Sequence, residues 1–214
     1  MKKVRNIVLF AVITLIFGCA GDAQRVGFDM SLERVERPEN IEKRFGKIKE
    51  PVINNECLLF EDNFIEATFT FNYNHISILL VNVSRKHTIK VNWDNAIWTD
   101  IMGSPYRVLH SGTSSVDKNI PQVPSVITTN KALMSTIVPS NHARRAGTGW
   151  YCEPLFHNTS IWTINMRSEL QKAQKYVGKT CSILLPLTIE GIQNDYTFIF
   201  RINDAMVVDR HKDL

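Results

Sequence analysis

The chain has 214 residues and carries 25 Lys and Arg side chains against 21 Asp and Glu, a formal net charge of +4. Three of the cations, Lys2, Lys3 and Arg5, lie at the very start, and subtracting them leaves 22 basic side chains against 21 acidic ones. This near-neutral balance provides no basic surface for nucleic acid, which we exclude as a partner. The rest of the chain is long enough to bury one hydrophobic core without disulfide support.

Residues 1–18 have the layout of a secretory signal peptide. The three cations are followed by an apolar run over residues 7–17, which is 11 residues long, and then by the small residue Gly18. A membrane-spanning helix needs roughly 18–20 apolar residues, so this run suits an export channel better than permanent residence in a bilayer. We therefore predict that residues 1–18 form a signal peptide that is removed on export.

The end of this signal, Ile16-Phe17-Gly18-Cys19, resembles the lipobox of bacterial lipoproteins. The resemblance implies that the Cys19 sulfur receives a diacylglyceryl group and that cleavage follows before Cys19. Ala20 stands where an aspartate would resemble the inner-membrane retention signal, which favours the outer membrane of the cell envelope. The alternative is an ordinary cleavable signal next to an unrelated cysteine. More than one acyl chain would anchor the protein stably to a membrane.

Composition divides the rest of the chain in two. Residues 19–60 are polar and charged and are predicted to form a tether, and residues 61–214 are predicted to form the globular domain. In that domain, apolar and polar residues alternate over 66–73 and 87–94, which predicts two half-buried strands. Residues 75–83 are almost continuously apolar and predict a strand covered on both faces. Residues 82–86 are expected to join it to the next strand as a hairpin.

The remaining elements follow at short intervals. Short strands are predicted at 106–110, 125–128 and 134–138, joined by long loops. Residues 168–178 predict a helix, with Ser168 as its cap and Gly178 at its end. An antiparallel pair is expected at 180–189 and 195–202, with a turn over 190–194. Short strands with one helix and no βαβ alternation predict an all-β fold, an antiparallel immunoglobulin-like β-sandwich, and a closed barrel is the main alternative.

Export places the other cysteines in an oxidising compartment. Cys181 shares a strand face with Ile183 and Leu185, which suits a buried free thiol. Cys57 and Cys152 lie at the edges of polar segments and are the preferred disulfide pair, although spacing alone does not determine connectivity.

Part of the domain resembles a group of uncharacterised bacterial envelope lipoproteins. The residues that carry the resemblance are Val81-Asn-Val-Ser84, Ile89-Lys-Val-Asn-Trp-Asp94, Ile101-Met-Gly103, Arg107-Val-Leu-His110 and Ile137-Val-Pro139. The resemblance covers about 60 residues and assigns no catalytic residue. From the pattern itself, Trp93 is expected to be an anchor on a sheet face or in the core, and Asp94 to cap the following turn.

No catalytic or metal-binding motif occurs in the sequence. The six histidines have no ligand partner at a recognised spacing, and neither HExxH nor a Cys-x-x-Cys pair is present. Gly-x-Ser-x-Gly is also absent. We therefore predict no catalytic residue, no metal and no cofactor.

The segment 142–151 is the strongest candidate for a binding loop. Arg144, Arg145, Trp150 and Tyr151 are residue types that are common in interfaces, and glycines flank them. The alternative is a solvated loop with Trp150 packed against the sandwich.

The function expected from the sequence is that of a non-enzymatic, membrane-anchored envelope lipoprotein that binds or assembles with another envelope component, for example a protein partner. An envelope hydrolase is the first alternative, and it requires at least two histidines, cysteines or carboxylates to converge in one pocket. A glycan-binding lipoprotein is the second alternative. It requires an exposed groove lined by aromatic rings from among Trp98, Trp150, Tyr151 and Trp162.

Overall fold

The computed structural model describes residues 24–38, 58–113, 119–146, 149–156 and 166–209. The strands of its first half are β1 (Gln24–Glu36), β2 (Leu58–Glu61), β3 (Ile65–Phe71), β4 (Ile76–Asn82), β5 (Ile89–Val91), β6 (Ile97–Thr99) and β7 (Pro105–His110). Those of its second half are β8 (Ser125–Ile127), β9 (Ala132–Pro139), β10 (Ala143–Ala146), β11 (Gly149–Cys152), β12 (Thr180–Ile189) and β13 (Ile192–Asp209). The helical elements are the short turns η1 (Trp93–Asn95) and η2 (Gln174–Tyr176) and the helix α3 (Met166–Ala173).

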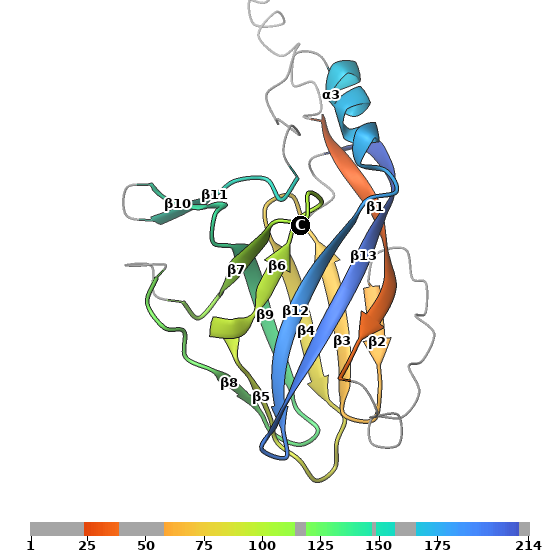
Figure 1. Ribbon diagram of the computed structural model, residues 1–214. Coiled ribbons are helices and arrows are strands. Elements are labelled where there is room, and N and C mark those ends of the chain that lie inside the picture. Colours follow the sequence, from red (N-terminus) through yellow and green to blue (C-terminus); the bar gives the residue numbers. More distant parts are fainter. Residues whose placement is uncertain (1–23, 39–57, 114–118, 147–148, 157–165, 210–214) are drawn as a thin grey trace, which may run out of the picture.

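Eleven of the strands form one antiparallel sheet that nearly closes into a barrel-like sandwich, and β10 and β11 form a separate two-stranded sheet (Figure 1). Their order is β1-β13-β12-β6-β7-β9-β4-β3-β2, and β5 and β8 extend the sheet from β12. The long pair β12 and β13 crosses in front of β3 and β4 in this view. The predicted antiparallel all-β fold with a short helix is therefore confirmed. Within the described residues, no helix is long and apolar enough to cross a bilayer.

The core lies between two layers of the sandwich, one containing β3 and the other β13, and it is rich in aromatic side chains. The Phe69 ring on β3 lies 4.7 Å from that of Phe198 and 5.1 Å from that of Phe200, both on β13, measured between centroids. All three side chains are fully buried. Burying each side chain of this size contributes about 1.5–3 kcal/mol. The alternation predicted over 66–73 and 195–202 therefore corresponds to inward-facing core residues.

The last two strands form the predicted antiparallel pair, from Thr180 opposite Arg201 to Ile189 opposite Ile192. The turn between them is tighter than predicted, because only Glu190 and Gly191 connect the strands. Both have positive φ, at 56° and 76°. Two consecutive positive φ values characterise the primed turns that match the twist of a hairpin. Cys181, at the start of β12, is 2% exposed, as expected of a buried thiol, and burial raises its pKa strongly.

The first strand lies in the segment predicted to be a tether. β1 pairs with β13 from Gln24 opposite Asp209 to Glu36 opposite Thr197. This part of the predicted 19–60 tether is therefore a strand of the sheet. Alternation does not reveal it, because the register shifts between Asp29 and Met30 and again between Leu32 and Arg34. Each shift interrupts the period of two on which strand prediction depends.

The predicted hairpin over residues 82–86 is wrong. β4 pairs with β3 and β9, whereas β5 pairs with β12 and β8, so the two strands lie in different layers. The buried Asn82 amide fixes the connection between β4 and β5, because its Nδ2 donates to the carbonyl oxygens of His87 at 2.8 Å and Ile127 at 3.0 Å. β4 is also not covered on both faces, since Leu79 on its outer face is 37% exposed.

The helix confirms the prediction over 168–178 in outline. α3 begins at Met166 and continues into η2, and Gly178 follows with a φ of 83°. Ser168 is the third residue of α3 rather than its cap. The helix packs on the ribbon of β1 and β13, where Ala173 is buried with Val26 and Ala205.

Candidate ligand-binding pocket

A pocket of about 200 Å³ lies where the end of β7 meets β9 and the hairpin formed by β10 and β11. Its lining combines aliphatic side chains with uncharged polar ones. The lining residues are Leu109, His110, Ser111, Thr113, Thr136, Val138, Ala143 and Cys152. Leu109 lies directly opposite Val138, and Ala143 lies opposite Cys152, so two cross-strand pairs form facing walls. None of the lining residues carries a formal charge when His110 is neutral.

The His110 imidazole is held between a buried ring and the backbone. Its ring stacks on Trp93 with the centroids 4.7 Å apart and the planes 14° from parallel. The Gly112 N–H donates to Nδ1 at 3.1 Å. The neutral tautomer that accepts this bond carries its proton on Nε2, which is buried without a hydrogen-bond partner among the described residues. The ring borders the pocket, while its Nε2 donor is buried from solvent.

Gly112 is needed for this arrangement. A Cβ at this position would come within 2.5 Å of His110 Cε1. The stack on Trp93 limits how far the ring can retreat. Close approach of the backbone to the ring, rather than a positive φ, is thus the reason for a glycine here.

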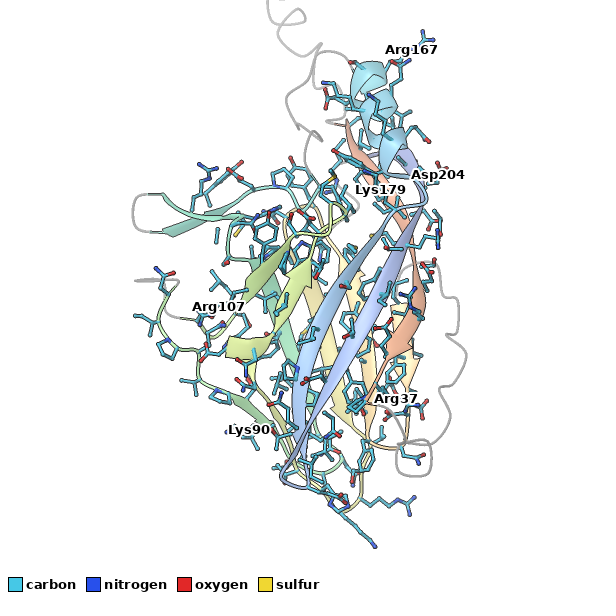
Figure 2. The ribbon with its side chains drawn as sticks, viewed as in Figure 1. Arg37, Lys90, Arg107, Arg167, Lys179 and Asp204 are labelled. Atoms are coloured by element: carbon cyan, nitrogen blue, oxygen red, sulfur yellow. The ribbon has the colours of Figure 1, made fainter. Side chains whose placement is uncertain are left out.

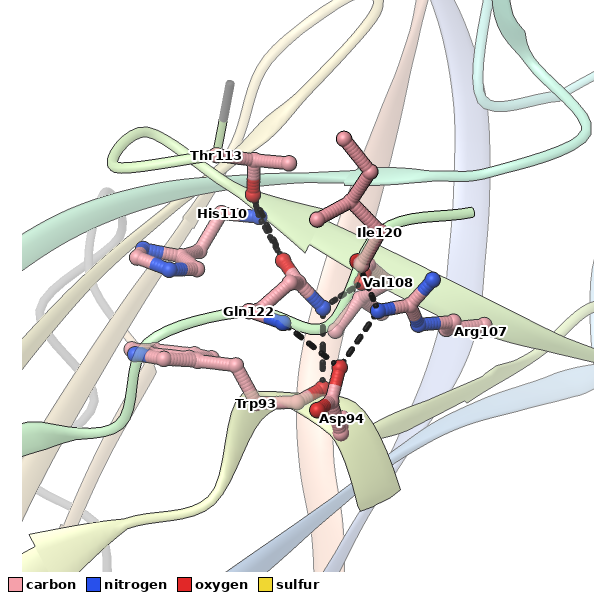
Figure 3. A network of polar contacts seen from close by, with 8 residues as sticks. All are labelled: Trp93, Asp94, Arg107, Val108, His110, Thr113, Ile120 and Gln122. Carbon is pink, nitrogen blue, oxygen red and sulfur yellow. Dashed lines mark hydrogen bonds and ion pairs between the residues drawn. The ribbon is translucent and has the colours of Figure 1, made fainter. Parts of the chain in front are cut away.

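Gln122 joins the segments behind His110 (Figure 3). Its side chain is 5% exposed, and Nε2 donates to the carbonyl oxygens of Trp93 at 3.1 Å and Val108 at 2.9 Å. Oε1 accepts from the His110 N–H at 3.1 Å and from the Thr113 hydroxyl at 2.6 Å. All four hydrogen-bonding sites of one buried amide are therefore used, which fixes the loop after β7 relative to η1.

Asp94 and Arg107 form the solvent side of the same network. Asp94 Oδ1 accepts from the Gln122 backbone N–H at 2.9 Å and from the Arg107 guanidinium. The Gln122 N–H, together with Arg107, holds the pKa of the Asp94 carboxyl below its usual value. Arg107 also donates to the Ile120 carbonyl at 2.9 Å. Asp94 therefore ties the chain around Gln122 to β7. This role of Asp94 differs from the predicted one, which was to cap the following turn. Trp93, by contrast, is buried in the core as predicted.

His110 and Cys152 line the same pocket, which meets the condition set for a hydrolase. The pKa shifts of the two side chains, however, do not favour catalysis by a thiol. Burial raises the pKa of the Cys152 thiol, and burial lowers the pKa of the His110 imidazole although Asp94 acts in the opposite direction. Both shifts favour the neutral pair over the thiolate and imidazolium that thiol catalysis uses. The arrangement therefore suits binding through hydrogen bonds and apolar contact better than nucleophilic attack.

Acidification should reveal the lowered pKa of His110. The unfolded chain takes up a proton near pH 6.5 more readily than the folded one, so stability is complete above about pH 6.5 and falls as the pH drops below it. His75 contributes in the same direction, because burial lowers its pKa too. We expect His110→Gln to reduce the dependence of the melting temperature on pH across this range, and His75→Gln/His110→Gln to reduce it further. An unchanged slope in both variants would contradict the buried neutral imidazole.

The predicted binding loop is a β-hairpin. Arg144 lies opposite Tyr151, and Arg145 lies opposite Trp150, in the pair formed by β10 and β11. The hairpin projects from the side of the barrel (Figure 1). Tyr151 is 55% exposed, and Arg144 forms an ion pair with Glu153 at 2.6 Å. Arg144 and Tyr151 therefore present an exposed pair on one face of the hairpin, whose opposite face includes the pocket wall of Ala143 and Cys152.

The other predicted site residues lie away from the pocket or outside the residues that the structure describes. Trp98 is fully buried, so it cannot line an exposed glycan groove. Cys19, Cys57 and Trp162 lie outside the described residues, and with Cys57 the predicted bridge to Cys152 does too. Within the described ranges, no group of three or more His, Cys, Asp or Glu residues is placed to hold a metal ion.

Ser111, Thr113, Gln122 and Thr136 were not predicted from the sequence as site residues. Ser111 and Thr113 follow His110 closely, but residues 111–122 have no clear periodicity, and Thr136 lies in the strand predicted over 134–138. No family model, no curated protein and no solved structure matches this chain.

Proposed function

We propose that this chain is a lipid-anchored lipoprotein of the bacterial envelope, and that its β-domain binds another envelope component without catalysing a reaction. The anchor is Cys19, after removal of residues 1–18, and the outer membrane is the favoured location. The resemblance of Ile16-Phe17-Gly18-Cys19 to a lipobox supports the anchor. The same proposal includes that the sandwich is of the immunoglobulin-like type.

The uncharged pocket beside the hairpin is the observation that carries the binding role. Aliphatic walls with a few uncharged polar side chains among them suit an apolar group. At about 200 Å³ the pocket is smaller than the roughly 300–1,000 Å³ of typical small-molecule sites. It suits a single apolar side chain inserted by a larger partner, which is how interface anchors commonly bind. A protein partner that also contacts the exposed hairpin is therefore the favoured ligand.

The anchor is tested by Cys19→Ser. We expect wild-type protein to incorporate radiolabelled palmitate and to sediment with membranes, and the variant to do neither, because the acylated sulfur is gone. A variant that still matured and sedimented with membranes would contradict the anchor.

The binding role is tested by crosslinking in intact cells. A photoreactive residue at Thr136 lies in the pocket wall, and the same residue at Thr70 provides a matched control. Thr70 lies two strands away on the same outer face, since it is opposite Ser77 and Ser77 is opposite Thr136. We expect a protein adduct from position 136 that is absent from position 70 and disappears when Val138→Glu places a charge in the pocket. The same adducts from both positions would argue against the pocket.

A further inference from the structure

The position of β1 limits how far the domain can lie from a membrane, if Cys19 is lipidated as proposed above. Four residues, 20–23, separate Cys19 from Gln24, where β1 begins, so five Cα-to-Cα steps join the two. A fully extended residue spans at most about 3.6 Å, so Gln24 lies within about 18 Å of the lipidated sulfur. β1 is paired with β13 from its first residue onward, which keeps this end of the barrel from moving away on a longer connection.

The helix α3 is the element at this end of the barrel. It packs against the first part of β1, where Met166 and Leu170 contact the cluster of Val26, Ala173 and Ala205. In Figure 1 it lies beside β1 and extends beyond the start of that strand. Among the described residues, the surface that α3 presents outward is therefore the one nearest to the anchor.

That outward surface is basic. Arg167, Lys172 and Lys175 are exposed along α3 and η2. The acid of the same helix, Glu169, is 5% exposed, and its carboxylate accepts from Lys172 at 2.7 Å. Asp204, on the neighbouring strand, accepts from the Gln174 amide at 3.2 Å. Among the described residues named here, cations thus outnumber acids on the outer face, as required of a surface that meets anionic headgroups.

We propose that the basic face of α3, formed by Arg167, Lys172 and Lys175, is held against the anionic surface of the bilayer by the short connection from Cys19 to β1. The opposite end then points away from the membrane. β13 has 18 residues, and a strand of this length spans about 55 Å, so the turn at Glu190 and Gly191 stands far from the lipid. Figure 2 shows Arg167 at the tip of α3 and Lys90 near the other end.

Labelling of lysine amines with a sulfonated, negatively charged ester tests this orientation. Lipidated protein is reconstituted into vesicles of phosphatidylethanolamine and phosphatidylglycerol at low salt, and the labelling rate of each lysine is compared by mass spectrometry with that in soluble Cys19→Ser protein. A surface potential of about −30 to −50 mV depletes a monovalent anion about three- to sevenfold near the membrane. We expect Lys175 to react slower by about this factor. Lys90, which is also exposed, should react at the same rate in both samples.

A longer connection provides the matched control. Insertion of about 20 Gly and Ser residues between Ala23 and Gln24 keeps the anchor but adds a flexible coil, so the Lys175 rate should return towards its value in solution. Equal effects on Lys175 and Lys90 would overturn the orientation, and a slow Lys175 after the insertion would overturn the role of the short connection. Flotation of the vesicles separates these outcomes from failure of the anchor. Protein that does not float with the lipid refutes lipidation of Cys19, whereas protein that floats with both lysines equally reactive refutes only the orientation.

Discussion

Replacing Asp62 with alanine is expected to lower the free energy of unfolding by about 3–5 kcal/mol. Asp62 follows β2, and its side chain is fully buried. Oδ1 accepts from the backbone N–H groups of Phe64 at 2.8 Å and Ile65 at 3.0 Å. Oδ2 accepts from the Tyr196 hydroxyl at 2.9 Å and from Arg37 at 3.1 Å, whose side chain is 12% exposed. Removal of the carboxylate leaves a largely buried guanidinium without this countercharge.

The effect should be large because Asp62 joins the two ends of the sheet. Arg37 follows β1 and Tyr196 belongs to β13, whereas Asp62 lies between β2 and β3, at the other end of the strand order. Urea unfolding followed by tryptophan fluorescence measures the loss. Glu66→Ala, which removes a half-buried acid from the outer face of β3, is the matched control and should cost no more than about 0.5 kcal/mol. Similar losses of unfolding free energy in the two variants would contradict the role of Asp62 in joining the two ends of the sheet.

Replacing Gln122 with methionine is expected to cost about 3 kcal/mol and to loosen the pocket. Methionine has nearly the same length but cannot donate to the buried carbonyl oxygens of Trp93 and Val108, or accept from the His110 N–H. The loop after β7 should therefore exchange its amide hydrogens faster. Urea unfolding measures the stability, and hydrogen exchange at residues 109–113 measures the loosening. Exchange equal to that of the wild type would contradict the role of Gln122.

The variant Gln122→Glu distinguishes the effect of losing the amide donor from the effect of changing the shape of the side chain. The new side chain has the same size, but when it is ionised it turns oxygen atoms toward two carbonyl oxygens. Burial raises the pKa of such a carboxyl, so the variant is most stable while it is protonated and loses stability relative to the wild type as the pH rises above about 4.3. The difference from the wild type should therefore be smaller near pH 4 than near pH 7. A difference that does not vary with pH would exclude this explanation.

The pocket also brings together residue types that form no motif in the sequence. His110 and Cys152 lie 42 positions apart in the chain and meet only because the hairpin of β10 and β11 folds next to the end of β7. The pKa shifts of both groups favour their neutral forms over the thiolate and imidazolium that thiol catalysis uses. The proposed binding role would depend on apolar contact, which requires no sequence motif.

Local pattern was sufficient for the strands whose faces differ in solvent exposure. Over residues 66–73 and 180–202 the alternation of apolar and polar residues identified both the strands and their inward faces, because side chains on a strand alternate between core and solvent. The buried thiol of Cys181 and the buried ring of Trp93 followed from the same reasoning. The signal peptide and lipobox proposed for residues 1–19 also depend on the sequence by itself, since they are defined by an apolar run and a cysteine rather than by packing.

Tertiary structure alone decided the rest. β1 is a strand because β13 pairs with it through two register shifts, although its own pattern is polar. Gln122 becomes part of a site only because the chain brings it behind His110, and Asp62 becomes a closure point only because the first and last strands of the sheet meet. These contacts join residues far apart along the chain, and the free energy that selects them comes from burial and hydrogen bonding in the assembled sheet, which no local window of sequence contains.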